Sequence, residues 1–240
     1  MRLFPVCKAL FFTIVVYSVF FQSCAARIDG SLAADGSAAL TMSMSLQPRM
    51  SALIRSLSAA GGQRDGAVLD GPAFAQSMSS APGVAYVAFT NTGPAAIEGS
   101  VRISHISEFL SVVGGRGFIT FEQRASSGGR CEIHIDRATS PAILELFSSE
   151  IADYLGALMA PIATGEELNK QEYLELVTSF YNRAISEEIA SSRIRASIGF
   201  PGQVNSVRGG TFSGRRANFD IPLLDLLVLE TPLVYEVTWN

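Results

Sequence analysis

The chain has 240 residues, of which 48% are hydrophobic and only 17% are charged, and its formal net charge is −4. This length and apolar content suit a folded domain with a sizeable core of its own. An acidic chain without a basic tract argues against nucleic acid as a general partner.

Residues 1–23 have the pattern of a secretory signal peptide. Arg2 and Lys8 give a positively charged head, residues 9–21 are almost wholly apolar, and small residues follow as far as Ala26. The apolar run is shorter than the ~18 to 20 residues that a membrane span needs. We therefore expect a cleaved leader rather than a transmembrane anchor.

The end of the leader resembles the lipobox of a bacterial lipoprotein. Ser23 fits the usual small residue before the cysteine, Phe21 and Gln22 depart from the usual pattern, and Cys24 follows. Relaxed boxes of this kind resemble those of spirochaete lipoproteins. The resemblance implies cleavage before Cys24 and a lipid on that residue, which would anchor the protein to a bacterial envelope membrane, facing the periplasm or the surface.

The residues that follow are small and polar, and they predict a lipidated cysteine and tether over 24–35, ahead of a single domain over 36–240. Ordinary secretion, with cleavage after Ala25 or Ala26, is the alternative to a lipid anchor.

Alternation of apolar and polar residues predicts the strands of this domain. The expected strands cover residues 38–46, 84–89, 95–105, 118–124, 130–137, 194–200, 211–219 and 235–239. Short helices are expected from helical spacing around residues 50–57, from a start at Asp70, and over residues 107–113.

Two long helices are expected between the strands. The first begins at Ser140-Pro141 and ends before Pro161. The second is capped by Asn169 or Thr164, with a glutamate three residues on as in a capping box, and continues to residue 189. A short linker makes them an antiparallel hairpin, with Tyr154 and Phe180 buried on the apolar stripes. The predicted fold class is α+β, an antiparallel sheet packed against a long helical hairpin.

This layout, with Pro201-Gly202-Gln203-Val204 and a closing strand that contains Trp239, resembles the lipid-anchored bacterial LppM-type domain. The resemblance covers much of the chain after the leader. It implies an α+β domain held at an envelope membrane, with contact with lipid, and it implies no reaction.

The sharpest candidate for catalysis is His134 between Glu132 and Asp136. Alternation places all three on one strand face, where His105 could join them to bind zinc or act as a general base. The alternative function is therefore a small envelope hydrolase or metal-dependent enzyme. The favoured interpretation is a solvated polar strand face, with no metal and no cofactor. The sequence also lacks the nucleophile elbow, Walker A and His-Glu-x-x-His motifs.

Three other features have two interpretations each. Cys131 is expected to be a buried, inert thiol rather than a reactive one. The arginines at 208, 215 and 216 could meet anionic lipid or form a solvated turn. The apolar run 221–234 is either core or a wall for a lipid-like ligand. The ligand contacts expected in that run are Leu223, Leu226, Leu227 and Leu229.

The function expected from the sequence is a non-enzymatic binding or scaffolding role at the envelope. The expected partners are the membrane, through the N-terminal lipid, and a lipid or other apolar ligand.

Overall fold

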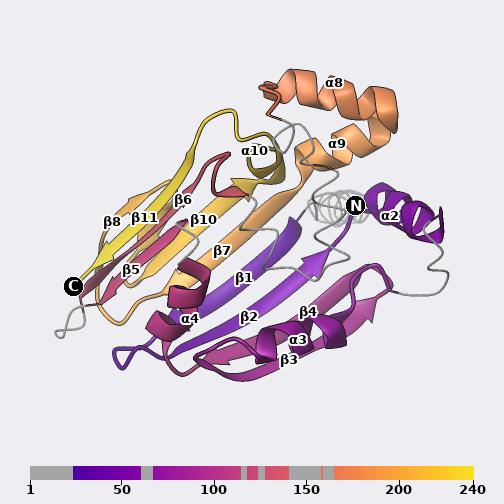
Figure 1. The fold of residues 1–240 in the computed structure, drawn as a ribbon. Coiled ribbons are helices and arrows are strands. Elements are labelled where there is room, and N and C mark those ends of the chain that lie inside the picture. Colours follow the sequence, from indigo (N-terminus) through magenta and orange to yellow (C-terminus); the bar gives the residue numbers. More distant parts are fainter. Residues whose placement is uncertain (1–23, 61–66, 115–117, 124–127, 141–157, 159–164) are drawn as a thin grey trace, which may run out of the picture.

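The computed structural model describes residues 24–60, 67–114, 118–123, 128–140, 158 and 165–240 (Figure 1). Within these ranges the strands form two sheets, and short helices pack against one face and one end of the larger sheet. No helix in the described ranges is long and apolar enough to cross a membrane.

The larger sheet, sheet A, has seven strands within the described part of the chain. In spatial order they are β3 (Val84–Gly93), β4 (Ala96–Ile103), β2 (Ala38–Ser45), β1 (Cys24–Leu32), β7 (Arg193–Gly199), β10 (Arg216–Pro222) and β9 (Thr211–Ser213). Neighbouring strands run antiparallel except β1 and β7, which are parallel. Sheet A is therefore mixed, with β1, the first strand in the described part of the chain, at its centre.

Strand β1 occupies most of residues 24–35, where the sequence predicted a tether. Ala26, Ile28 and Leu32 alternate with polar residues, so one face of the strand can join the core. A Cβ at Gly30 would lie 2.4 Å from a methyl group of Leu40, so glycine allows β1 and β2 to pack this closely. The small residues that suggested a tether instead suit a central strand in close contact with both neighbours.

The smaller sheet, sheet B, has four strands within the described residues: β5 (Ile119–Gln123), β6 (Gly129–Ile135), β11 (Leu233–Trp239) and β8 (Val204–Arg208). Its apolar residues share a core cluster with one half of sheet A. The buried members of this cluster are Leu32, Phe200, Val204, Ala217, Val237 and Trp239. The two sheets are therefore joined by a common apolar layer.

The described helices pack in two places. They are α2 (Pro48–Ala60), α3 (Gly71–Ser79), α4 (Ile106–Gly114), α8 (Lys170–Phe180), α9 (Arg183–Ser191) and α10 (Leu223–Val228). Helix α3 covers β3 and β4, where the rings of Phe74 and Phe89 meet edge to face at 4.8 Å. Helices α2, α8, α9 and α10 share a second cluster at the end of sheet A where β1 and β7 begin (Figure 1).

The capping residues in the sequence correctly predicted where two helices start. Asp70 accepts a hydrogen bond from the backbone N–H of Ala73 at the start of α3. At the start of α8, Asn169 accepts from the N–H of Glu172, and the Glu172 carboxylate accepts from the N–H of Asn169. This is one of the two capping boxes that the sequence left open, the one that begins at Asn169.

The prediction of a long helical hairpin was wrong. The predicted second helix breaks into α8 and α9, because Asn182 is extended and its side chain accepts from the N–H of Ile185, which starts a new helix. Phe180 stands at the break and is 74% exposed rather than buried. Tyr154 and nearly all of the first predicted helix lie outside the described residues. The fold class is therefore corrected to a mixed α/β arrangement of two sheets with short helices.

Candidate functional site

The polar face of sheet A carries charged residues in register across neighbouring strands. Arg195 on β7 pairs with Arg27 on β1, which pairs with Ser43 on β2. On the other side of Arg195 lies Asp220 on β10. The opposite face of the same strands is apolar, so alternation alone places these polar side chains on the outer face.

This face holds an open groove of about 640 Å³. We call it the arginine groove. It is lined by Arg27, Ile28, Asp29, Arg195, Ala196, Ser197, Gly209, Gly210, Thr211, Asn218, Phe219 and Asp220. A second hollow of about 310 Å³ shares Arg27 and Asp29 and extends toward β2 and β4.

The ion pairs around the arginine groove are loose. Asp220 lies 3.5 Å from Arg195 Nε and 3.7 Å from Arg193 Nη1. Asp29 lies 3.8 Å from Arg27 Nε and 3.9 Å from Arg216 Nη1. These distances exceed that of a charge-assisted hydrogen bond, which is about 2.7 to 2.9 Å. The two aspartates therefore leave guanidinium N–H groups of Arg27 and Arg195 available to a ligand.

The central pair, Arg27 and Arg195, is the most informative part of the groove. The two residues are direct partners on adjacent strands, and like charges in that relation destabilise a sheet. An anion bound between the two guanidinium groups would offset this repulsion and accept hydrogen bonds from both. The arrangement therefore suits a phosphate or carboxylate group.

The predicted cluster around His134 is an ordinary polar surface. Arg130 donates to Glu132 at 2.5 Å and to Glu236 at 2.7 Å, so Glu132 is already paired. Asp136 lies beyond the end of β6, and its nearest approach to His134 Nε2 is 3.5 Å. A hydrogen bond from the Thr139 N–H is the main cause that lowers the pKa of Asp136, and His134 contributes less.

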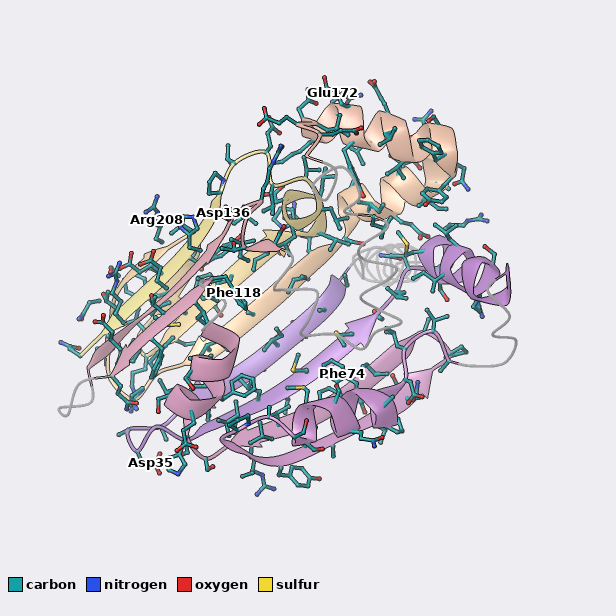
Figure 2. The ribbon with its side chains drawn as sticks, viewed as in Figure 1. Asp35, Phe74, Phe118, Asp136, Glu172 and Arg208 are labelled. Carbon is teal, nitrogen blue, oxygen red and sulfur yellow. The ribbon has the colours of Figure 1, made fainter. Side chains whose placement is uncertain are left out.

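The other histidine does not join this cluster. His105 lies near Asp35, where it contributes to the lowered pKa of that carboxyl, although hydrogen bonds from Ser37 are the larger cause. Figure 2 shows Asp35 and Asp136 well apart on the molecule. Within the described ranges, no group of three or more histidine, cysteine, aspartate or glutamate side chains is arranged to hold a metal ion.

The four leucines proposed as ligand contacts differ in burial. They lie on α10 or directly after it. Leu227 is 1% exposed and Leu229 is 3% exposed, and Leu227 belongs to the cluster formed with α2, α8 and α9. Leu223 and Leu226 are half-buried. Only these last two retain surface that a ligand could touch without displacing the core.

Cys131, Arg215 and Arg216 have structural roles. Burial raises the pKa of the Cys131 thiol to about 11, so the thiol stays protonated at neutral pH, as expected for an inert cysteine. Arg215 donates to the backbone oxygens of Phe200 and Pro201, and Arg216 donates to Ser197. These guanidinium groups hold the turn at the end of sheet A opposite to Cys24.

Sequence reasoning missed the arginine groove. Arg27 lies in the stretch interpreted as a tether, and Arg195 lies on a strand about 170 residues away. The available signal was the alternation Arg27–Ile28–Asp29 and Arg195–Ala196–Ser197, which gives each strand a polar face. The pairing that brings the two faces together is long-range and parallel, and periodicity does not reveal it.

No protein family model matches the chain, and no curated protein matches it. Among solved structures, the chain is similar to the NMR structure of the folded domain of LppM from Mycobacterium tuberculosis. The TM-score is 0.41, the sequence identity is 11%, and the match covers 92% of each chain. The likeness concerns the fold, and it agrees in part with the LppM-type layout noted in the sequence.

Proposed function

We propose that this protein is a lipid-anchored bacterial envelope protein whose folded domain binds an anionic head group in the arginine groove, without catalysing a reaction. The observation that carries the binding role is the Arg27–Arg195 pair at the centre of an open groove, where each guanidinium group is only loosely paired with an aspartate. Two adjacent guanidinium groups with free donors form a ready site for phosphate.

The size and openness of the groove favour a head group over a whole lipid. A volume of about 640 Å³ lies within the range of ordinary small-molecule sites. Arginine side chains on two adjacent strands line the groove, so it suits the charged part of an amphipathic molecule. Leu223 and Leu226, half-buried on α10, are the proposed contacts for an apolar part of a ligand.

The start of β1 supports Cys24 as the anchored residue. Cys24 is opposite Arg193 in the parallel pair, and Ala26 is opposite both Met44 and Ile194. Cleavage after Ala25 or Ala26 would remove the first residues of a central strand, whereas cleavage before Cys24 keeps all of them. A lipid on Cys24 would then hold the end of sheet A directly at the membrane surface.

The anchor is tested by labelling cells with palmitate. Cys24→Ala is expected to abolish incorporation of the label and either to release the protein from the membrane fraction or to block leader cleavage. Cys131→Ala is the matched control, because it removes the other cysteine of the mature chain and should keep the label. Equal labelling of the wild type and Cys24→Ala would refute the anchor.

The arginine groove is tested by titrating the mature protein with short-chain phosphatidylglycerol. Arg27→Gln and Arg195→Gln should each weaken binding about tenfold, since a hydrogen bond to a charged group contributes roughly 1.5 to 3 kcal/mol. Arg102→Gln is the control: Arg102 lies on the same sheet face, stacks on Tyr86 at 5.1 Å and does not line the groove.

Two comparison ligands identify what the arginine groove recognises. Phosphatidylcholine of the same chain length carries no net charge and should bind more weakly. Inorganic phosphate should compete if the phosphate is the recognised group. Unchanged affinity in both groove variants would show that the ligand binds elsewhere or that the groove is only a polar surface.

A further inference from the structure

The turn between α8 and α9 exposes two aromatic side chains. Phe180 is 74% exposed and Tyr181 is 37% exposed. Phe180 is the most exposed of the large hydrophobic residues in the described part of the chain. A single exposed aromatic residue is common, but two adjacent ones at the tip of a projecting helix pair form an apolar contact surface.

The exposure of Phe180 follows from how the two helices pack. Tyr173 and Val177 on α8 face the core, as do Ile185 and Ile189 on α9. The chain turns at Asn182, and the buried residues on the far side of the turn belong to α9 rather than α8. Phe180 is left at the outside of the turn, where its removal would cost the fold little.

This turn lies at the end of sheet A where the chain enters the fold. Helix α9 runs from the turn to Ser191, and β7 then begins at Arg193, the partner of Cys24. The nine helical residues of α9 span about 13 Å, and the short links at its two ends and the spacing between β7 and β1 add to this, so Phe180 lies within roughly 35 Å of the start of β1. Figure 1 shows α8, α9 and α2 together at this end of the sheet.

The charged residues near the turn do not supply a strong electrostatic attraction to another surface. Arg183, with its side chain 85% exposed, is paired with Glu187 at 2.8 Å. Any contact made by the turn would therefore depend on the aromatic rings. Tyrosine and other amphipathic aromatic residues are favoured where an apolar phase meets water.

We propose that the α8–α9 turn inserts Phe180 into the interface of the membrane that holds the Cys24 lipid, with Tyr181 at the level of the head groups. The proposal depends on the anchor proposed above. Because β1 starts at Cys24, no spacer separates the lipid from the fold, and the membrane is the surface held closest to this turn. An aromatic contact at the interface would add to the attachment that the lipid provides and would fix the orientation of the domain at the membrane.

The test places a fluorescent reporter at the turn. Phe180→Trp is prepared in the full lipidated protein and reconstituted into phosphatidylglycerol vesicles whose acyl chains carry bromine, which quenches nearby tryptophan. Phe212→Trp is the matched control, because Phe212 is 47% exposed on the edge strand β9, toward the end of sheet A opposite to Cys24. The native Trp239 is 3% exposed and gives a constant background in both.

We expect quenching of Phe180→Trp to be at least about twofold stronger than that of Phe212→Trp, as for a side chain at the interface. Equal quenching in vesicles that carry the protein would overturn the insertion and leave the anchor intact. Failure of the wild type to float with vesicles would overturn the anchor, and this proposal with it. A blue shift of Phe180→Trp that grows with protein concentration in detergent, without quenching in vesicles, would assign the turn to self-association and overturn the membrane contact.

Discussion

Replacement of Trp239 by alanine is expected to lower the free energy of unfolding by about 3 to 5 kcal/mol, the cost of removing a large buried aromatic residue. The Trp239 side chain is 3% exposed and lies in the layer shared by sheets A and B. Its ring centroid is 4.7 Å from that of Phe200 and 6.0 Å from that of Phe121. A Cβ at Gly129 would lie 2.3 Å from the ring, so the surroundings are already tightly packed.

Trp239→Phe separates ring packing from the indole N–H. The buried Trp239 Nε1 has no hydrogen-bond acceptor among the described residues, and a buried unpaired donor costs about 1 to 3 kcal/mol. Phenylalanine keeps most of the ring and removes that donor, so Trp239→Phe should destabilise much less than Trp239→Ala.

The measurement is the urea midpoint and slope of the protein that begins at Cys24. Phe212→Ala is the control, because a half-exposed ring at the sheet edge should change stability by no more than about 0.5 kcal/mol. If Trp239→Ala unfolds at the wild-type midpoint, the two sheets do not depend on a common core.

Local patterns predicted most of the individual elements. The alternation from residue 38 predicted β2, and that from residue 130 predicted β6 to within two residues. Caps located the starts of α3 and α8, because a cap depends on three or four neighbouring residues. One predicted strand, 211–219, divides into β9 and β10 at Gly214, whose φ of +58° makes a turn.

Long-range relations were the part that sequence could not supply. Glu188 on α9 accepts hydrogen bonds from the N–H groups of Arg49 and Met50, so α2 is capped from a residue almost 140 positions away. The parallel contact of β1 with β7 is equally remote, and it creates the Arg27–Arg195 pair. The periodicity of apolar residues and the capping residues predict individual helices and strands. The candidate site depends on which strands lie next to each other in the fold.

Two leucines of α10 differ in burial, so they are expected to have different roles. Leu227 is 1% exposed and packs with Tyr173, Val177, Ile185 and Ile189. Leu227→Ala is therefore expected to cost about 2 to 5 kcal/mol of stability, the range for a buried leucine whose site cannot collapse fully. Leu226, its neighbour on the same helix, is half-buried and serves as the matched variant.

Leu226→Ala should cost clearly less stability than Leu227→Ala, because less apolar area leaves the core. Both variants are compared by urea unfolding and by native mass spectrometry of protein purified from its own envelope, which reports retained lipid. Loss of lipid in Leu226→Ala at a near-normal unfolding midpoint would support α10 as a contact for the apolar part of a ligand. Equal destabilisation by both variants, with no separable change in retained lipid, would assign the whole of α10 to the core and leave the arginine groove as the proposed binding surface.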